Sequence, residues 1–462
     1  MEETKSNSYF ETAPIGRLIA RFAIPSIISL VVNALYNIVD QIFIGNGVGY
    51  LGNGATTVVF PITVVATALA LLIGDGGAAY LSLRLGEGNS ERATKGVGNS
   101  IVMLVSAGIL LLAIALIFLK PLLVLFGGTE AIMPYALAYG KIISIGLPFV
   151  VISTGLNSII RADGNPKMSM VSMILGAVIN TILDPVFIFV FKWGVEGAAL
   201  ATILGQIVSF VISAIYIRKL RSVKLTRDSF RLDANTLRSC SGLGISSFIT
   251  QIAIVIMSIL CNVLLAKYGA LTEYGSDIPI TVLGIVMKVN QILIAILIGI
   301  SSGAQPILGY NYGARNMKRV KKTYGIMLIA SAVVSVAAFI MFQCFPQSII
   351  NLFGSESDLY NQFALKAFHI FLLMCIASAY QVTSSIFLQA IGKPIPSMVS
   401  ALLRQLIIFV PAAIILPTLM GIDGILWAMP IADLSSAVIT LFMIIYAMKE
   451  INQQEHYQGG KK

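Results

Sequence analysis

Charged side chains are scarce in this sequence, and that scarcity decides the class of protein. Asp, Glu, Lys and Arg make up 11% of the residues, against 57% hydrophobic residues and a mean hydropathy of +0.89. A soluble globular domain does not need so much apolar surface, because most of its exterior contacts water. The composition therefore predicts a protein embedded in a lipid bilayer and argues against an ordinary soluble enzyme.

Histidine, cysteine pairs and the common catalytic motifs are also rare or missing. The sequence has two histidines, His369 and His456, and contains no H-E-x-x-H, G-x-S-x-G or G-x-x-x-x-G-K-[ST] segment. Those segments are typical of zinc proteases, serine hydrolases and ATP-binding loops. The four cysteines form no C-x-x-C pair and lie in or beside apolar segments, which indicates small buried residues. We therefore expect no enzyme, no metal site, no cofactor and no direct use of ATP.

Long apolar stretches make up most of the chain. A helix that crosses a bilayer needs about 20 mostly apolar residues, whereas a strand of a membrane barrel alternates over about ten. Twelve stretches meet the helical requirement, at about residues 17–44, 54–83, 96–119, 132–160, 168–191, 195–217, 240–266, 279–308, 322–344, 362–390, 395–419 and 422–447. The sequence thus predicts an all-α polytopic membrane protein with twelve transmembrane helices.

Basic residues gather in alternate loops between these stretches. The loops after the second, fourth, sixth and eighth stretches hold clusters of Lys and Arg, the largest between Arg218 and Arg231, while the opposite loops are poor in both. Lys and Arg collect on the cytoplasmic side of membrane proteins. We therefore expect a multi-pass protein of the cell inner membrane with both termini in the cytoplasm. The net charge of +10 then reflects topology, with a secondary attraction to anionic lipid, and does not indicate nucleic acid.

The chain repeats itself after 227 residues. Leu125-Phe126-Gly127 recurs as Leu352-Phe353-Gly354, and Gly194-Val195-Glu196-Gly197 recurs as Gly421-Ile422-Asp423-Gly424. Six helices per copy give both copies the same orientation, with substrate and ion sites near the middle of the membrane. We expect two pseudo-symmetric six-helix bundles, at residues 1–217 and 238–462, joined by a cytoplasmic linker at 218–237.

Two carboxylates stand inside apolar stretches. Asp40 lies in the first stretch and Asp184 in the fifth, each one helical turn after a polar residue, Tyr36 and Asn180 respectively. A charged carboxylate at bilayer depth is unfavourable, so by default it marks an ion pathway or a binding site. Neither acid has a counterpart in the second repeat, and cation chemistry is therefore expected in the first bundle.

Asp40 shares one face of its helix with other polar side chains. Asn33, Asn37 and Asp40 follow one another at helical spacing, with Tyr36 between them. A polar stripe on an otherwise apolar helix should face the interior of the bundle. Burial in a medium of low dielectric favours the neutral form of a carboxyl, so Asp40 and Asp184 are candidate proton carriers. The same oxygens would also suit Na⁺, and the sequence does not choose between the two ions.

Taken together, these features resemble the multidrug and toxic compound extrusion (MATE) family, and length and texture are similar to its bacterial MepA-type exporters. The resemblance rests on two six-helix repeats, on Pro25 and Asp40 in the first helix, and on Asn180-x-x-x-Asp184-Pro185 in the fifth. It implies export of bulky organic cations by antiport with H⁺ or Na⁺. By match, it also implies a cation site in the first bundle that consists of Asp40, Asn180, Asp184 and Thr202, with Tyr36 and Asn157 as looser members.

Further residues are candidates for substrate contact. A promiscuous drug pocket needs side chains that adapt their shape, such as Met and aromatic residues. The candidates for cationic drugs or dyes are Asn33, Asn37, Asp40, Phe60, Phe149, Met257 and Met287. Asp75 and Lys288 are left as either structural or cavity residues, and Arg404 with Asp433 is interpreted as a structural charge pair.

We expect a drug exporter that acts as a monomer, and three other functions are alternatives to drug export. A flippase for lipid-linked precursors is the runner-up, but it should line its cavity with basic residues that hold a diphosphate. An ion channel usually repeats its filter in every subunit, and no duplicated filter segment appears in the sequence. A membrane enzyme is disfavoured by the missing catalytic motifs.

Overall fold

The computed structural model describes residues 11–126, 128, 130–275, 277–353 and 358–459, and these form helices and short connections with no strand among them. Gly354 of the repeated triplet and both ends of the chain lie outside the described residues. The helices have the following bounds: α2 Ile15–Val48, α3 Tyr50–Gly86, α4 Ser90–Leu125, α5 Met133–Ala162, α6 Pro166–Pro185, η1 Val186–Val190, α7 Gly194–Ile217, η2 Arg227–Phe230, α8 Ala234–Gly269, α9 Asp277–Gly313, α10 Met317–Cys344, α11 Pro346–Phe353, α12 Asp358–Phe371, α13 Cys375–Ala390, α14 Pro394–Leu402, η3 Leu403–Ile408, α15 Phe409–Met420 and α16 Ile422–Gly459.

The predicted all-α membrane architecture is confirmed. Eleven spans within the described residues are long and apolar enough to cross a bilayer, and α12 with α13 forms a twelfth if this bent pair is taken as one span. The pair bends by 47°. At the bend the backbone N–H of Leu373 bonds the carbonyl of Ile370, and that of Cys375 bonds Leu372, so bonds three residues apart replace those of the α-helix.

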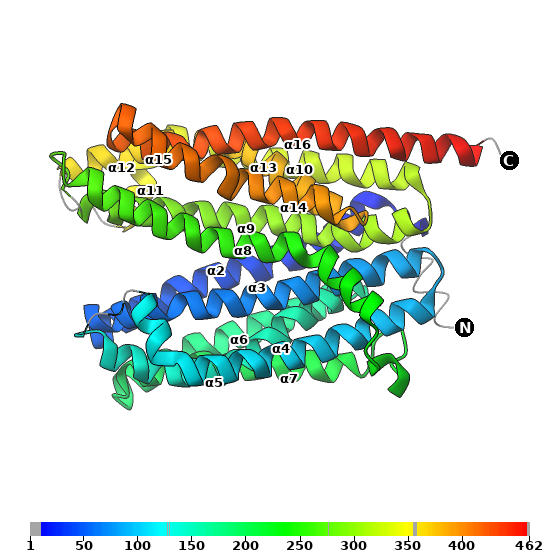
Figure 1. Cartoon of the computed structure of the whole chain (residues 1–462), viewed down its shortest axis with the longest axis horizontal. Helices are drawn as coiled ribbons and strands as arrows, with labels where there is room; N and C mark the ends of the chain where they lie inside the picture. Colours follow the sequence, from blue (N-terminus) through cyan, green and yellow to red (C-terminus); the bar gives the residue numbers. More distant parts are fainter. Residues whose placement is uncertain (1–10, 127, 129, 276, 354–357, 460–462) are drawn as a thin grey trace.

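The helices form two groups that lie side by side (Figure 1). Helices α2 to α7 make up the first bundle, and α8 to α16 make up the second. The start of α2 and the end of α16 lie at the same end of the molecule in Figure 1, which we call the terminal end. The link between α7 and α8, with its short helix η2, also lies there, as expected when each bundle has an even number of spans.

Helix starts at the terminal end repeat between the bundles. The Asn89 side chain, at the start of α4, accepts a hydrogen bond from the backbone N–H of Arg92 (3.0 Å). Asn316, 227 residues later at the start of α10, accepts one from Arg319 (3.4 Å). A side-chain oxygen at this position satisfies one of the donors that the first helical turn leaves free. The sequence repeat is therefore also a repeat of local structure.

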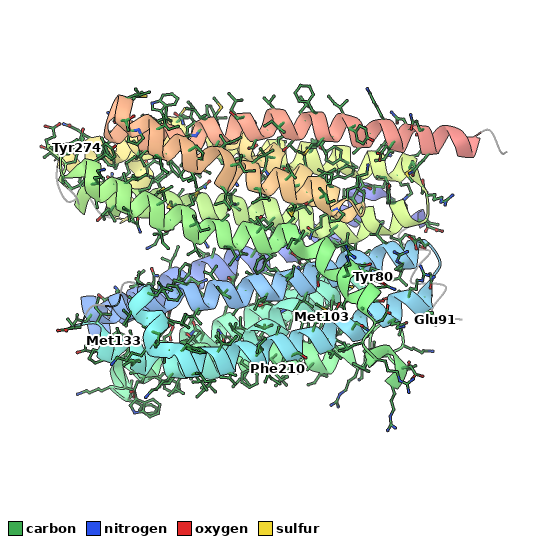
Figure 2. All side chains as sticks on the ribbon, viewed as in Figure 1. Tyr80, Glu91, Met103, Met133, Phe210 and Tyr274 are labelled. Atoms are coloured by element: carbon green, nitrogen blue, oxygen red, sulfur yellow. The ribbon has the colours of Figure 1, made fainter. Side chains whose placement is uncertain are left out.

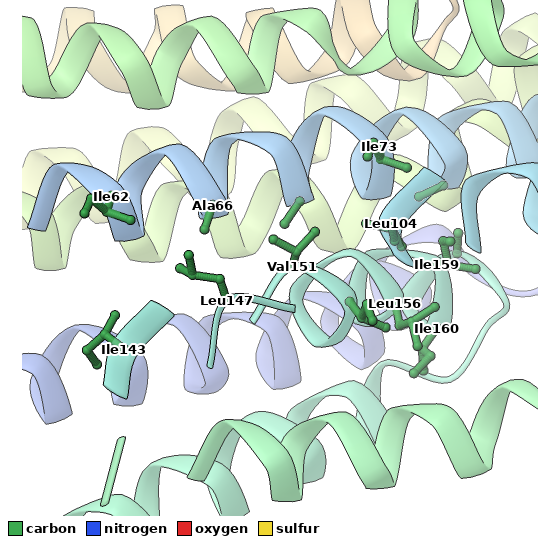
Figure 3. Close-up of a cluster of buried hydrophobic side chains, with 14 of the residues drawn as sticks. Ile62, Ala66, Ile73, Leu104, Ile143, Leu147, Val151, Leu156, Ile159 and Ile160 are labelled. Atoms are coloured by element: carbon green, nitrogen blue, oxygen red, sulfur yellow. The ribbon is translucent and has the colours of Figure 1, made fainter. Parts of the chain in front are cut away.

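Apolar side chains of α3, α4 and α5 form the core of the first bundle (Figure 3). The cluster contains, among others, Ile62, Ala66, Ile73, Leu104, Ile143, Leu147, Val151, Leu156, Ile159 and Ile160. Lipid tails are as apolar as these side chains, so close packing, rather than removal from water, holds such helices together. This packed core gives the functional side chains of α2 and α6 a fixed frame.

The linker between the bundles is fastened first at Asp163, directly after α5. Its carboxylate is buried and accepts hydrogen bonds from the Tyr216 hydroxyl (2.8 Å) and from the backbone N–H groups of Arg221 (3.0 Å) and Ser222 (2.8 Å). Burial raises the pKa of Asp163, and these donors act against that rise. The start of the linker is thus held against the end of α5.

Asn99 of α4 fastens the second half of the linker. Its buried side-chain amide donates to the carbonyl oxygens of Ser229 (3.1 Å) and Arg231 (3.0 Å), and its oxygen accepts from the Asp233 N–H (2.9 Å). One side chain therefore satisfies three backbone groups of the segment that leads into α8.

The two bundles touch through backbone at the terminal end. A Cβ atom added to Gly76 of α3 would lie 2.0 Å from the carbonyl oxygen of Cys240 in α8, and one added to Gly244 would lie 1.8 Å from that of Leu72. Only glycine permits these approaches. The ribbons of α3 and α8 converge toward this end in Figure 1, and Tyr80 lies at their junction in Figure 2.

We predict that Asn99→Ala loosens the linker. The change leaves three backbone groups without their partner, at about 1–3 kcal/mol for each group that stays buried. Trypsin should cleave the linker severalfold faster in the purified protein, with cleavage followed by mass spectrometry. Asn235→Ala is the matched control, because Asn235 is exposed in the first turn of α8. Equal cleavage rates in the two variants would contradict this role of Asn99.

Candidate cation site in the first bundle

Asp40 and Asp184 come together between α2 and α6. Their carboxyl groups lie within hydrogen-bonding reach of each other, and Asp184 is fully buried. Asp184 is followed by Pro185, and the chain then passes into the π-helical turn η1. Proline removes a backbone donor, and π-helical turns are frequent at functional sites. The local irregularity of the fifth span is thus found next to its acid.

Three buried oxygens at this place lack a donor. Asp40 Oδ1, Asp184 Oδ2 and Asn180 Oδ1 receive no hydrogen bond from the part of the chain that the structure describes. Two ionised carboxylates only accept, so they cannot bond each other unless a proton or another cation lies between them. Buried acceptors without a partner are unfavourable by about 1–3 kcal/mol each, and more when charged. One positive charge between the two carboxyl groups would therefore satisfy these acceptors.

Neighbouring polar groups orient the pair. The side-chain amide of Asn180 donates to Asp184 (3.4 Å) and to the Thr202 hydroxyl (3.3 Å), which turns its own oxygen toward the unfilled side. Tyr36 and Tyr139 lie close enough to both acids for direct electrostatic interaction. Asp40, Asp184, Asn180, Thr202 and Tyr36 are thus brought together as the sequence predicts. Tyr139 of α5 was not identified, because no spacing or motif in α5 marks it.

Asn157 lies in a separate hydroxyl cluster. Its oxygen accepts from Ser213 (3.5 Å), and Ser172 exchanges hydrogen bonds with Ser209 and Ser213 (2.9 Å each). These contacts bind α6 to α7. The structure does not place Asn157 in direct hydrogen-bond contact with either acid.

The residues proposed for substrate contact are spread over both bundles. Asn33 and Asn37 are exposed on α2, and Phe60 is 52% exposed on α3. Phe149 packs edge-on against Phe210 (5.4 Å between ring centres). Met257 is buried in the core of the second bundle, and Met287 packs against that core. The structure does not gather these side chains around Asp40, and the drug-contact assignment stays a prediction.

The second bundle contains a buried charge pair of its own. Arg404 Nε donates to Asp433 Oδ1 at 2.7 Å, and both side chains are buried. Counted from the matching prolines Pro166 and Pro394, where the second repeat has one residue inserted, Arg404 stands where the first bundle has Gly176. The serine cluster is repeated too, since Ser400 bonds Thr440 at 2.8 Å in the positions of Ser172 and Ser213. The two bundles thus share a hydroxyl contact between equivalent helices. They differ in that a buried acid of the second bundle is paired with an arginine side chain.

The sequence matches the MatE family over residues 25–186 and 246–415. It is similar to the multidrug export protein MepA of Staphylococcus haemolyticus, with 26% identity over 96% of this chain and 95% of the relative. It is 25% identical to MepA of Staphylococcus aureus over 96% of both chains.

Solved structures share the fold. An outward-facing multidrug resistance MATE transporter of the MOP superfamily superposes with a TM-score of 0.89 at 22% identity, covering 97% of this chain and 99% of its own. A Pyrococcus furiosus MOP superfamily transporter, for which the reverse polarity of the binding pocket suggests a different function, superposes with a TM-score of 0.88 at 22% identity, covering 97% and 98%.

We predict that Arg404→Met strongly destabilises the protein. Removal of one partner leaves the Asp433 carboxylate buried and unpaired, which is worth about 3–5 kcal/mol. The double variant Arg404→Met, Asp433→Leu should recover most of the loss, since apolar residues of similar volume replace such pairs well. Thermal unfolding in detergent measures both. A single variant as stable as the parent protein would mean that the pair contributes nothing.

Proposed function

The chain belongs to the MatE family, and we propose that it is a secondary active multidrug efflux transporter that exports lipophilic organic cations by antiport with H⁺. The observation that carries the proposal is the facing pair of Asp40 and Asp184 with their unfilled oxygens. One proton between two carboxyl oxygens satisfies both. A sodium ion would use the same oxygens together with Asn180, and the experiment below separates the two ions.

Coupling requires that the protein does not bind the proton and the drug equally well at the same time. A ligand with the same affinity for two conformations shifts neither of them. A proton that enters from outside reduces the negative charge of the pair and so weakens the attraction for a cationic drug on the same bundle. A one-for-one exchange of a proton for a monovalent drug cation moves no net charge across the membrane, so the membrane potential does not contribute to it. The exchange of one proton for a drug cation is therefore favoured by the pH gradient in each cycle.

The position of the bundle contacts indicates which side of the molecule is closed. The charge pattern of the loops puts the terminal end in the cytoplasm. Since α3 and α8 touch at that end, the molecule is closed toward the cytoplasm in this structure. Alternating access then consists of opening this contact while the opposite end closes. One chain contains both bundles, so a monomer suffices.

A flippase for lipid-linked precursors is the second candidate. The P. furiosus transporter, which has the same fold, is described as having a binding pocket of reverse polarity. Among the described residues Asp40 and Asp184 form no ion pair with a basic side chain, and Arg404 of the second bundle is occupied by Asp433. These charges favour a cationic substrate over a diphosphate.

We predict that Asp40→Asn abolishes gradient-driven efflux. Asparagine keeps the size of the side chain but cannot gain or lose a proton. Ethidium uptake into inverted vesicles, which corresponds to export from the cell, should be lost under either a pH or a Na⁺ gradient while the protein stays folded and inserted. Asp184→Asn should impair efflux equally or less, and Leu260→Asp in the second bundle should rescue neither variant.

The same assay has outcomes that count against the proposal. Normal efflux and normal pH dependence in Asp40→Asn would remove the carboxyl pair from the mechanism. Transport by the parent protein under a Na⁺ gradient alone would replace H⁺ by Na⁺. Binding of a lipid-linked diphosphate without binding of ethidium would favour the flippase.

We predict that Lys224→Cys is shielded from impermeant thiol reagents in intact cells, because Lys224 is exposed in the cytoplasmic linker. The chain supplies its own control in Cys344, an exposed thiol at the far end of α10. Cys344 should label from outside in the same cells, and Lys224→Cys should label only after lysis. The reverse pattern would invert the topology.

A further inference from the structure

Asp75 is a partly buried acid of the first bundle that the cation site does not use. It lies on α3, and its carboxylate accepts a hydrogen bond from each bundle. Ser158 of α5, in its own bundle, donates to Oδ1 at 2.7 Å, and Ser247 of α8, in the other bundle, donates to Oδ2 at 2.9 Å. Arg161 lies 3.8 Å from the carboxylate on the side of Ser158. Asp75 therefore joins the bundles at the contact that closes the terminal end.

The surroundings of Asp75 leave little room for anything else. Gly76, its neighbour in the chain, approaches the backbone of Cys240 in α8, and Gly244 approaches Leu72. The side chain of Asp75 is only 16% exposed. Across this contact the Ser247 hydroxyl is in turn contacted by the side-chain amide of Gln389 (3.3 Å), which belongs to the second bundle. Each partner of the hydrogen bond is thus positioned from behind by its own bundle.

Separation of the bundles would remove only one of the hydrogen bonds that Asp75 accepts. When α8 moves away, Asp75 loses the Ser247 hydroxyl but keeps Ser158 and the nearby Arg161 guanidinium. The charge is not left without partners in either conformation, which would be strongly unfavourable for a buried group. A single hydrogen bond then separates the closed from the open arrangement at this point.

We propose that Asp75 is a positioning residue of the transport cycle, which latches the bundles together at the terminal end through Ser247 and releases them when that hydrogen bond breaks. The proposal rests on the proposed function, because a latch has a role only if the bundles alternate.

The chain carries its own reporter for this latch. Cys240 lies in the contact itself, fully buried with Ala79, Tyr80 and Leu243. Its thiol can meet a reagent only when α3 and α8 separate, so its rate of alkylation measures the open population. The experiment uses the full chain in detergent without any ion gradient, with Cys261, Cys344 and Cys375 changed to alanine.

In this background Ser247→Ala should raise the rate of Cys240 alkylation roughly tenfold, the equilibrium factor of one hydrogen bond of ordinary strength. Ser246→Ala is the matched control. It is the same change one residue earlier, but Ser246 bonds Ser397 within the second bundle (3.2 Å). Its alkylation rate should equal that of the parent background. Asp75→Ala should match or exceed Ser247→Ala, and Asp75→Asn should lie closer to the parent, because its amide oxygen still accepts from Ser247.

Thermal unfolding of the same proteins separates a latch from a merely structural bond. The proposal is overturned if Ser247→Ala and Ser246→Ala alkylate at the same rate, or if faster alkylation always follows a lower unfolding temperature. Neither reading depends on drug efflux. Normal efflux with no latch effect would reject the latch alone, whereas loss of the carboxyl mechanism would show in the vesicle assay with Asp40→Asn.

Discussion

The structure depends on a positive charge that its own side chains do not supply. Asp40 and Asp184 face each other at membrane depth, and the surrounding residues give hydroxyls and one amide but no cation. Two adjacent ionised carboxylates repel each other, and burial makes each less stable. A proton or another cation between the two carboxyl groups would relieve this repulsion, which is the basis of the proposed coupling to a gradient.

The second bundle has the same architecture without the two facing acids of the cation site. Its helices repeat the serine contacts between α6 and α7, yet Arg404 occupies the place of Gly176 and neutralises Asp433 permanently. A tethered guanidinium cannot be exchanged for H⁺ or Na⁺, because arginine stays protonated. Pseudo-symmetry thus preserves the scaffold, while the second bundle lacks the acids of the candidate cation site and has Leu260 and Pro411 in their places.

The sequence predicted those features that follow from composition and helical spacing. The scarcity of charge predicted the spans, and the acids Asp40 and Asp184 predicted a shared site, because a carboxylate at bilayer depth must meet a partner. Contacts between distant segments had no such signature. Tyr139 reaches the acids only through the packing of α5, and the serine contacts of Asn157 depend on how α7 lies against α6. Asp75 stood in a visible GDGG segment, but its bond to Ser247 depends on how two bundles dock, which no local pattern encodes.

Helix α2 connects the two places where charge and contact matter. Asp40 lies in its second half, while Ile27 and Ala23 in its first half touch the backbone of α9, where Cβ atoms on Gly299 and Gly303 would lie 2.7 Å and 2.5 Å from their Cα atoms. Pro25 lies between these two contacts and removes a backbone hydrogen bond there, which lowers the resistance of the helix to bending. Helix α2 thus carries both Asp40 and the close contacts with α9 of the second bundle. Under the proposed mechanism, a change in the charge of Asp40 would therefore act on a helix that also joins the two bundles.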